Sequence, residues 1–173
     1  QSRASVLLMA GAHRLNSSQP SGEQPERQIS DPAHSTATFF HAAHQGLEQA
    51  GQTVLQIHGF AARSDKDPQA VMSDGRDDGY DPPALTALSS EFNAAKISHQ
   101  VVNFEEDWLT ARSNVQGQSM EQKGLTGPTG PSQFVHLELE ASMRTDPAKF
   151  QSVVQALGHW SRQIFSQNQT PPP

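Results

Sequence analysis

Two polar residues in apolar surroundings are the strongest candidates for chemistry in this sequence. His58 comes near the end of the apolar run 53–60, and Glu138 stands between two leucines in the run 134–140. Both runs are typical of strands, and open α/β sheets bind their ligands just outside the carboxyl ends of the strands. A neutral imidazole at such an end either ligates zinc or is hydrogen-bonded in a sharp turn at Gly59.

The carboxylate of Glu138 is unusual because an unpaired charge in the middle of a strand is costly. It lies either on a solvated strand face or in a crevice where its acidity is useful. Strand alternation places His136, Glu138 and Glu140 on one face, so an exposed edge strand stays an alternative. The side chain of Glu138 is therefore the candidate for acid–base chemistry.

Histidine and carboxylate are the ligands that any zinc site here would use, since the chain has eight histidines and no cysteine. His41 and His44, spaced i and i+3, share one helical face. No glutamate stands between them as in the His-Glu-x-x-His arrangement of metallopeptidases. These two histidines therefore predict a partly solvated helix face rather than a zinc site.

Three further residues are expected near His58. His13 follows the first apolar run directly and either shares the edge of the crevice with His58 or belongs to a charged turn with Arg14. Asp31 and His34 precede a predicted helix, where they either cap it or line the same crevice. A zinc site built from His13, His34 and His58 with one water is chemically allowed, because three imidazoles suffice for catalytic zinc.

Strand-like and helix-like segments alternate along the chain. This pattern predicts an α/β fold with a mainly parallel open sheet flanked by helices. We expect one domain over 1–168 and a disordered tail over 169–173; the 109–132 stretch is predicted to be a loop. The expected strands are 5–12, 54–58, 100–104 and 134–139, and the expected helices are 36–50, 83–97 and 147–166.

Charge and hydropathy exclude several classes of protein. The chain has 173 residues and a formal net charge of −6, which repels phosphate backbones and argues against nucleic-acid binding. Mean hydropathy is −0.62, and the longest apolar run is far shorter than the roughly 20 residues that span a bilayer. We therefore expect neither nucleic-acid nor membrane partners, while localisation and oligomeric state stay open.

Four short segments, followed by Arg144, carry a resemblance to one family. They are Asp-Pro-Ala-His-Ser-Thr-Ala-Thr-Phe (31–39), Gln-Ile-His-Gly (56–59), Ser-Asn-Val (113–115) and Val-His-Leu-Glu-Leu (135–139). In this order they resemble the phage-type poly-γ-glutamate hydrolases, compact relatives of the zinc carboxypeptidases. The resemblance implies a zinc-carboxypeptidase-like fold, with His58 as zinc ligand and Glu138 as general base. It also implies that Asn114 and Arg144 contact the substrate or support the site.

One part of the family pattern is missing. In the family, the first strand ends in a histidine followed by a glutamate, and these two are further zinc ligands. Here that run ends at His13 and Arg14, and the nearest acids, Glu23 and Glu26, have the wrong spacing. Either the ligand-bearing strand precedes Gln1 or the site has changed. We expect the former.

The resulting hypothesis is a zinc-dependent hydrolase of amide bonds in γ-glutamyl or peptide-like substrates. A metal-bound water would attack, Glu138 would accept its proton, and Arg14, Arg112 or Arg144 would bind a substrate carboxylate. His58 and Glu138 should then lie roughly 4–8 Å apart across the crevice. The alternative is a non-catalytic binding domain of the same fold with an incomplete metal site.

Overall fold

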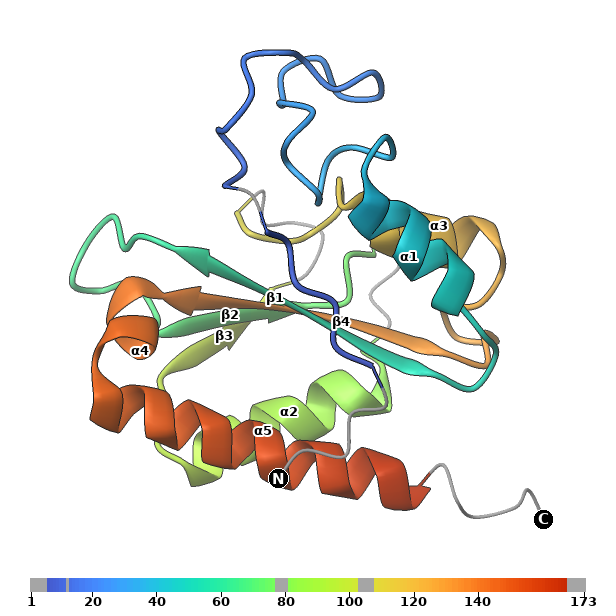
Figure 1. Cartoon of the computed structure of the whole chain (residues 1–173). Coiled ribbons are helices and arrows are strands. Elements are labelled where there is room, and N and C mark those ends of the chain that lie inside the picture. The colour runs from blue at the N-terminus through green and yellow to red at the C-terminus, as the bar shows by residue number, and fades with distance from the viewer. Residues whose placement is uncertain (1–5, 12, 77–80, 103–107, 168–173) are drawn as a thin grey trace.

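A mixed sheet between two groups of helices forms the molecule, seen here in a computed structural model (Figure 1). The structure describes residues 6–11, 13–76, 81–102 and 108–167. The strands are β1 (Thr53–Phe60), β2 (Ala70–Ser73), β3 (His99–Val101) and β4 (Gln133–Glu140). The helices are α1 (Phe39–Leu47), α2 (Pro83–Ala94), α3 (Val115–Gln122), α4 (Ala141–Thr145) and α5 (Pro147–Gln167).

The sheet has the strand order β1-β4-β2-β3 and is open. β1 pairs with β4 and β2 with β3 in parallel, whereas β2 pairs with β4 antiparallel. The α/β prediction is confirmed, but the expected mainly parallel sheet is a mixed one. The segment 61–69 between β1 and β2 contains no helix, so the chain reverses direction there instead of crossing over to a parallel strand.

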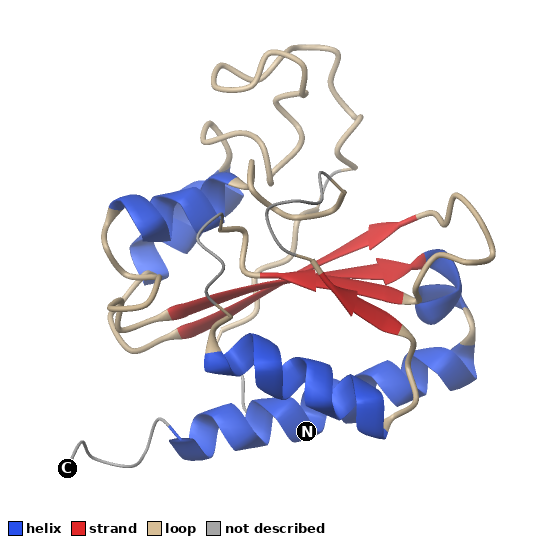
Figure 2. Ribbon diagram, turned by 180° about the vertical axis from the view of Figure 1, so that it is seen from behind, coloured by secondary structure: helices blue, strands red, loops and turns tan. Residues whose placement is uncertain are grey.

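One face of the sheet is covered by α2 and α5, which lie together beneath it (Figures 1 and 2). Val135, Leu137 and Leu139 of β4 point into this layer, where they join Phe92 of α2 and Trp160 of α5. The Trp160 indole is satisfied there, because its Nε1 donates to the Ala84 carbonyl at 2.8 Å. Strand alternation therefore turns the intervening residues of β4 to the opposite face.

The helix predictions near 36–50, 83–97 and 147–166 are confirmed with shifted ends. The first helix begins at Phe39 because the Thr38 side chain caps it, its Oγ1 accepting from His41 N at 3.1 Å. The strands near 54–58 and 134–139 are also confirmed. β3 ends at Val101, and positions 103 and 104 of the expected strand 100–104 lie outside the described residues, as do 169–173.

The expected buried strand at 5–12 is wrong over its described part, 6–11. That segment has no strand assignment, and Val6, Leu7 and Met9 are 54%, 78% and 80% exposed. An apolar run becomes a buried strand only when a neighbouring strand and a covering layer accept it. β1 is the edge of the sheet, and its Ile57 is itself 49% exposed.

Two helices were not predicted. α3 lies in the stretch 109–132 that was expected to be a loop, and it buries polar side chains, Gln116 and Ser119 among them. A helix with a polar buried face shows no apolar period in its sequence, which is the reason it was missed. The short α4 follows β4 directly, and none of the described helices is long and apolar enough to cross a membrane.

Candidate metal centre

His58, His136 and Glu138 come together on the face of the sheet opposite α2 and α5. β1 and β4 are adjacent parallel strands whose register places His58 beside Glu138. His58 Nδ1 lies 4.0 Å from Glu138 Oε1, and His136 Nε2 lies 3.5 Å from the same oxygen. Their three potential ligand atoms lie within 4.8 Å of one another. His58 and Glu138 thus face each other, at the short end of the expected separation.

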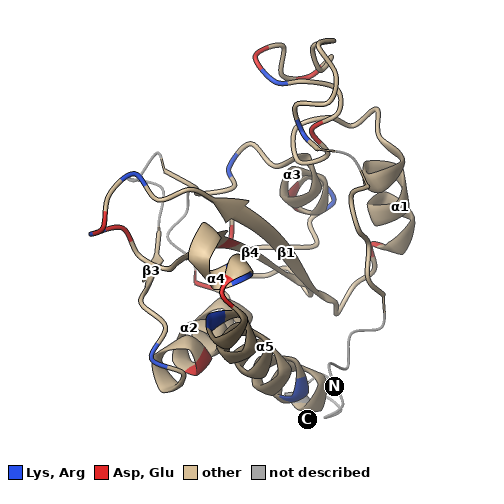
Figure 3. Ribbon diagram, turned by 60° about the vertical axis from the view of Figure 1, so that its left-hand side comes forward, with Lys and Arg blue, Asp and Glu red and all other residues tan. Residues whose placement is uncertain are grey.

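Glu138 is a buried carboxyl, 7% exposed, in the central part of the sheet. Burial raises its pKa to about 7, although the Arg14 and Arg144 charges act in the opposite direction. Its Oε2 has no hydrogen-bond partner among the described residues. The alternative of an exposed edge strand is therefore wrong, since β4 lies between β1 and β2. Figure 3 shows acidic positions on β4, whereas most other charged residues lie on loops and helices.

The two imidazoles of the cluster are neutral near pH 7. Burial lowers the pKa of His58 to about 4 and that of His136 to about 3. Asp31 opposes the shift at His58, and the Leu109 carbonyl opposes it at His136. A neutral imidazole has the lone pair that a metal needs, so these two rings and the adjacent carboxylate fit a divalent transition metal such as zinc.

Further polar groups line the surroundings of the cluster. His34 Nδ1 lies 3.2 Å from the Ser113 carbonyl. A hydrogen bond from Nδ1 to this carbonyl leaves Nε2 as the nitrogen that can bind a ligand. Burial lowers the pKa of His34. Asp31 Oδ1 accepts from Ala33 N at 3.2 Å and also acts on the charge of His58. The charges of Asp31 and His34 therefore act on His58, while a position of these two residues in the lining of the crevice stays a prediction. His13 is exposed, and its Nδ1 accepts from Leu15 N.

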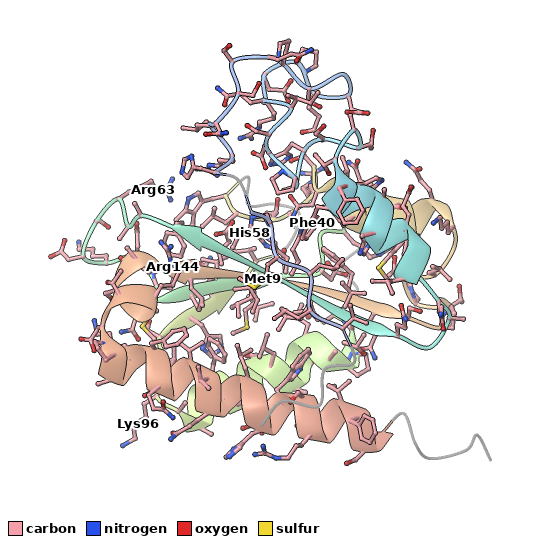
Figure 4. The ribbon with its side chains drawn as sticks, in the orientation of Figure 1. Met9, Phe40, His58, Arg63, Lys96 and Arg144 are labelled. Carbon is pink, nitrogen blue, oxygen red and sulfur yellow. The ribbon has the colours of Figure 1, made fainter. Side chains whose placement is uncertain are left out.

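Arg144 is fixed to the ends of both strands that carry the cluster. Its Nε donates to the Leu139 carbonyl at 3.1 Å and its Nη2 to the Phe60 carbonyl at 3.3 Å. A Cβ on Gly59 would lie 2.4 Å from the Arg144 guanidinium carbon. The expected sharp turn at Gly59 is wrong, because β1 continues to Phe60. The glycine instead leaves room for the side chain of Arg144, which is labelled in Figure 4.

Asn114 takes part in a buried chain of side-chain amides. Its Nδ2 donates to Gln56 Oε1 at 2.7 Å, Gln56 Nε2 donates to Gln116 Oε1, and Gln116 Nε2 donates to the Pro32 carbonyl. Asn114 is 3% exposed. Its described contacts join α3 to β1 and to the segment before α1, so its contact with a substrate stays a prediction.

The remaining predicted cations differ in their relation to the cluster. Arg14 is exposed, and its charge acts on both His58 and Glu138. Arg112 is also exposed, and its backbone carbonyl accepts a hydrogen bond from Gln118 Nε2. The charges of Arg14 and Arg144 both act on Glu138.

His41 and His44 form a separate buried pair between α1 and α3. They are 3% and 7% exposed, and His44 Nε2 lies 3.0 Å from Glu48 Oε1. Glu48 also pairs with Lys123, which follows α3. The expected partly solvated helix face is wrong, because α3 covers it. A tertiary contact between two helices is not visible in the sequence of either one.

His136 is the member of the cluster that sequence reasoning did not assign. The alternation of β4 had placed it on the face of Glu138, and a His-x-Glu spacing on a buried strand was the available signal.

Comparisons with known proteins found no relative of this chain. No protein-family model matches the sequence, and no significant match is found among curated proteins or solved structures. The fold and the site together define a mixed α/β domain with a His-His-Glu cluster in which His136 and Glu138 are buried and His58 is partly exposed. The resemblance to poly-γ-glutamate hydrolases stays a prediction.

Proposed function

We propose that this chain is a zinc-dependent hydrolase of amide bonds in γ-glutamyl or peptide-like substrates. The observation that carries the proposal is the position of Glu138, a carboxyl with a pKa raised to about 7, beside the imidazoles of His58 and His136. A general base works best when its pKa lies near the working pH. Perturbed carboxyls with a specific set of neighbours are concentrated at catalytic sites.

His58 and His136 would hold the metal. When bound, zinc would polarise the scissile carbonyl and activate a water molecule. One buried atom supports a missing partner at this place, since Glu138 Oε2 has no hydrogen-bond partner among the described residues. Imidazole ligands also suit ferrous iron, so the identity of the metal is part of the test.

Glu138 is proposed to move the proton. Its carboxylate accepts a proton from the attacking water, and the resulting carboxylic acid returns it to the nitrogen of the leaving amine. Burial favours the protonated form and the charges of Arg14 and Arg144 favour the ionised form, so both forms are accessible near neutral pH. Arg14 is exposed and its charge acts on Glu138, so it is the cation proposed to bind a carboxylate of the substrate, because Arg144 already bonds two carbonyls.

The test measures metal content and hydrolysis on the same preparations. The purified protein is loaded with zinc, cobalt or ferrous iron, its metal is quantified by mass spectrometry, and γ-glutamyl oligomers and dipeptides are offered as substrates. His58→Ala should lose both metal and activity, while His159→Ala, which removes an exposed histidine, should lose neither. Stoichiometric metal without hydrolysis of any amide would overturn the proposal and favour the non-catalytic binding domain.

A further inference from the structure

We propose that His41, His44 and Glu48 form a second site for a divalent transition-metal ion, where α1 packs against α3 (Figure 1). The three residues stand at positions i, i+3 and i+7, so they share one face of α1 and its C-terminal cap. The site belongs to a helix pair, whereas the candidate metal centre lies on β1 and β4. It therefore stands or fails independently of the proposed function.

Each of the three side chains has one buried polar atom without a hydrogen-bond partner among the described residues. These atoms are His41 Nδ1, His44 Nε2 and Glu48 Oε1. The two histidines are buried, and the side chain of Glu48 is 1% exposed. Buried polar atoms are nearly always paired with protein, water or an ion. Three of them on one helix face, all of types that bind metals, indicate a shared ligand.

His44 and Glu48 already have the spacing of two ligands of one ion. His44 Nε2 lies 3.0 Å from Glu48 Oε1, and two ligand atoms bound to a tetrahedral ion at about 2.0–2.1 Å are roughly 3.3 Å apart. The Gln116 carbonyl of α3 accepts a hydrogen bond from the His44 ring. Because Nε2 has no partner, the donor is Nδ1, which is the way in which metal-binding histidines are usually oriented. A cation between Nε2 and the carboxylate would stabilise both.

His41 supplies the third ligand. Its ring centroid lies 6.4 Å from that of His44, whereas two imidazoles bound to one tetrahedral ion have centroids roughly 5 Å apart. A side-chain rotation that brings the His41 ring about 1–2 Å closer would complete the set. Burial lowers the pKa of both imidazoles, so both rings keep the lone pair that a metal needs near neutral pH.

The charges around the site both favour and oppose a cation. Glu48 caps the C-terminus of α1, where the helix dipole is negative, and the charge of Glu23 acts on His41. Glu48 Oε2 contacts the Lys123 ammonium, which repels a metal. The Lys123 side chain is 45% exposed, so its ammonium can turn into water. Because Lys123 and His41 must both move, we expect this site to fill only after the candidate metal centre has filled.

Metal titration of His58→Ala isolates the second site, because this variant lacks an imidazole of the candidate metal centre. The protein is dialysed against rising concentrations of zinc or cobalt, and the bound metal is quantified by mass spectrometry. One equivalent should bind. His58→Ala/His44→Leu should bind none in the same range, since leucine is close to the ring in volume and has no ligand atom. His58→Ala/His159→Ala, which removes an exposed histidine, should keep the equivalent.

Two further variants separate metal binding from a merely structural role. Lys123→Met in the same background removes the competing ammonium, so affinity for zinc should rise at least about threefold. Lys66→Met changes an exposed loop residue and should leave affinity unchanged. Glu48→Gln keeps the shape of the side chain but removes its charge, so affinity should fall at least about 10-fold. Circular dichroism checks that each variant is folded.

Three results would overturn the second site. They are the absence of bound metal in His58→Ala at millimolar zinc, an equivalent that His44→Leu does not remove, and a positively charged His44 at neutral pH. The last, seen by nitrogen NMR, would mean that a proton stabilises the contact with Glu48. None of them affects the proposed function, because His44→Leu alone should keep the metal of β1 and β4 and the hydrolysis of amides.

Discussion

Glu138 Oε1 lies 4.0 Å from His58 Nδ1 on the neighbouring parallel strand, and the same oxygen lies 3.5 Å from His136 Nε2. The register of β1 with β4 creates this arrangement, because paired residues of adjacent strands present their side chains on the same face. One carboxyl therefore faces two neutral imidazoles in a buried setting. The chemistry of the chain is proposed to depend on this contact.

Substitution of Glu138 tests its role as a base. Glu138→Gln keeps the shape of the side chain but removes the proton acceptor, so the rate of amide hydrolysis should fall by about 10²–10⁴. Metal content should stay near that of the parent protein, in contrast to His58→Ala, which should lose the metal. Glu26→Gln, at an exposed position, serves as the matched control. Unchanged activity of the metal-loaded Glu138→Gln protein would reject the general-base role.

Substitution of His136 tests whether the second imidazole binds metal. His136→Gln replaces the imidazole ring with an uncharged amide. Zinc at a concentration 100-fold above its Kd should stabilise the parent protein by about 2.7 kcal/mol. Its melting temperature should therefore rise when zinc is added. The variant should lose most of this shift while keeping its fold, as followed by calorimetric melting with and without zinc. An equal zinc shift in both proteins would remove His136 from the ligand set.

The stability of the metal-free protein should depend on pH in two opposite directions. Burial raises the pKa of Glu138 from 4.5 to about 7, so the folded state holds a proton that the unfolded state releases, and this contribution is lost as the pH rises through that window. Burial lowers the pKa of His58 and His136 from 6.5 to about 4 and about 3. The unfolded state then binds more protons, and stability is lost as the pH falls below about 6.5.

Urea denaturation over a pH series measures both effects. Relative to the parent protein, Glu138→Gln should gain stability between pH 5 and pH 8, by up to a few kcal/mol. His136→Gln should reduce the loss of stability on the acid side. A constant difference in the free energy of unfolding between parent and Glu138→Gln across this range would mean that the carboxyl is not shifted.

Gly59 and Arg144 should behave as a coupled pair. In Gly59→Ala, the new Cβ would occupy the place of the Arg144 guanidinium and displace its bonds to the Phe60 and Leu139 carbonyls. Unfolding free energy should fall by about 1–3 kcal/mol. When Arg144 is already replaced by alanine, Gly59→Ala should lower the free energy of unfolding only slightly further. A double-mutant cycle measures this, and additive effects of the two substitutions would contradict the contact.

Asn114 distinguishes support of the fold from contact with substrate. Asn114→Ala leaves Gln56 Oε1 without its donor in a buried place, so we expect a loss of about 1–3 kcal/mol in stability. If Asn114 only supports the fold, KM and kcat of the folded variant should stay close to those of the parent. A selective rise in KM, with stability unchanged, would instead show that the side chain meets the substrate.

The local pattern of apolar and polar residues was sufficient to predict the long helices and strands, and to single out His58 and Glu138 as site residues. The apolar faces of α2 and α5 follow a helical period, and Pro83 and Pro147 mark the starts of these helices. The alternation of β4 separates Leu137 and Leu139 from Glu138. The sequence therefore indicated both the α/β class and a carboxylate that needed a partner.

Tertiary structure decided which strands are neighbours, and with that the composition of the site. The sequence does not contain the β1–β4 pairing, in which strands separated by about seventy residues bring His58 beside Glu138 and add His136 to them. It also does not show that α3 covers His41 and His44, or that 6–11 remains outside the sheet. Periodicity reports which faces of an element are apolar, but burial of a polar side chain depends on the element that packs against it.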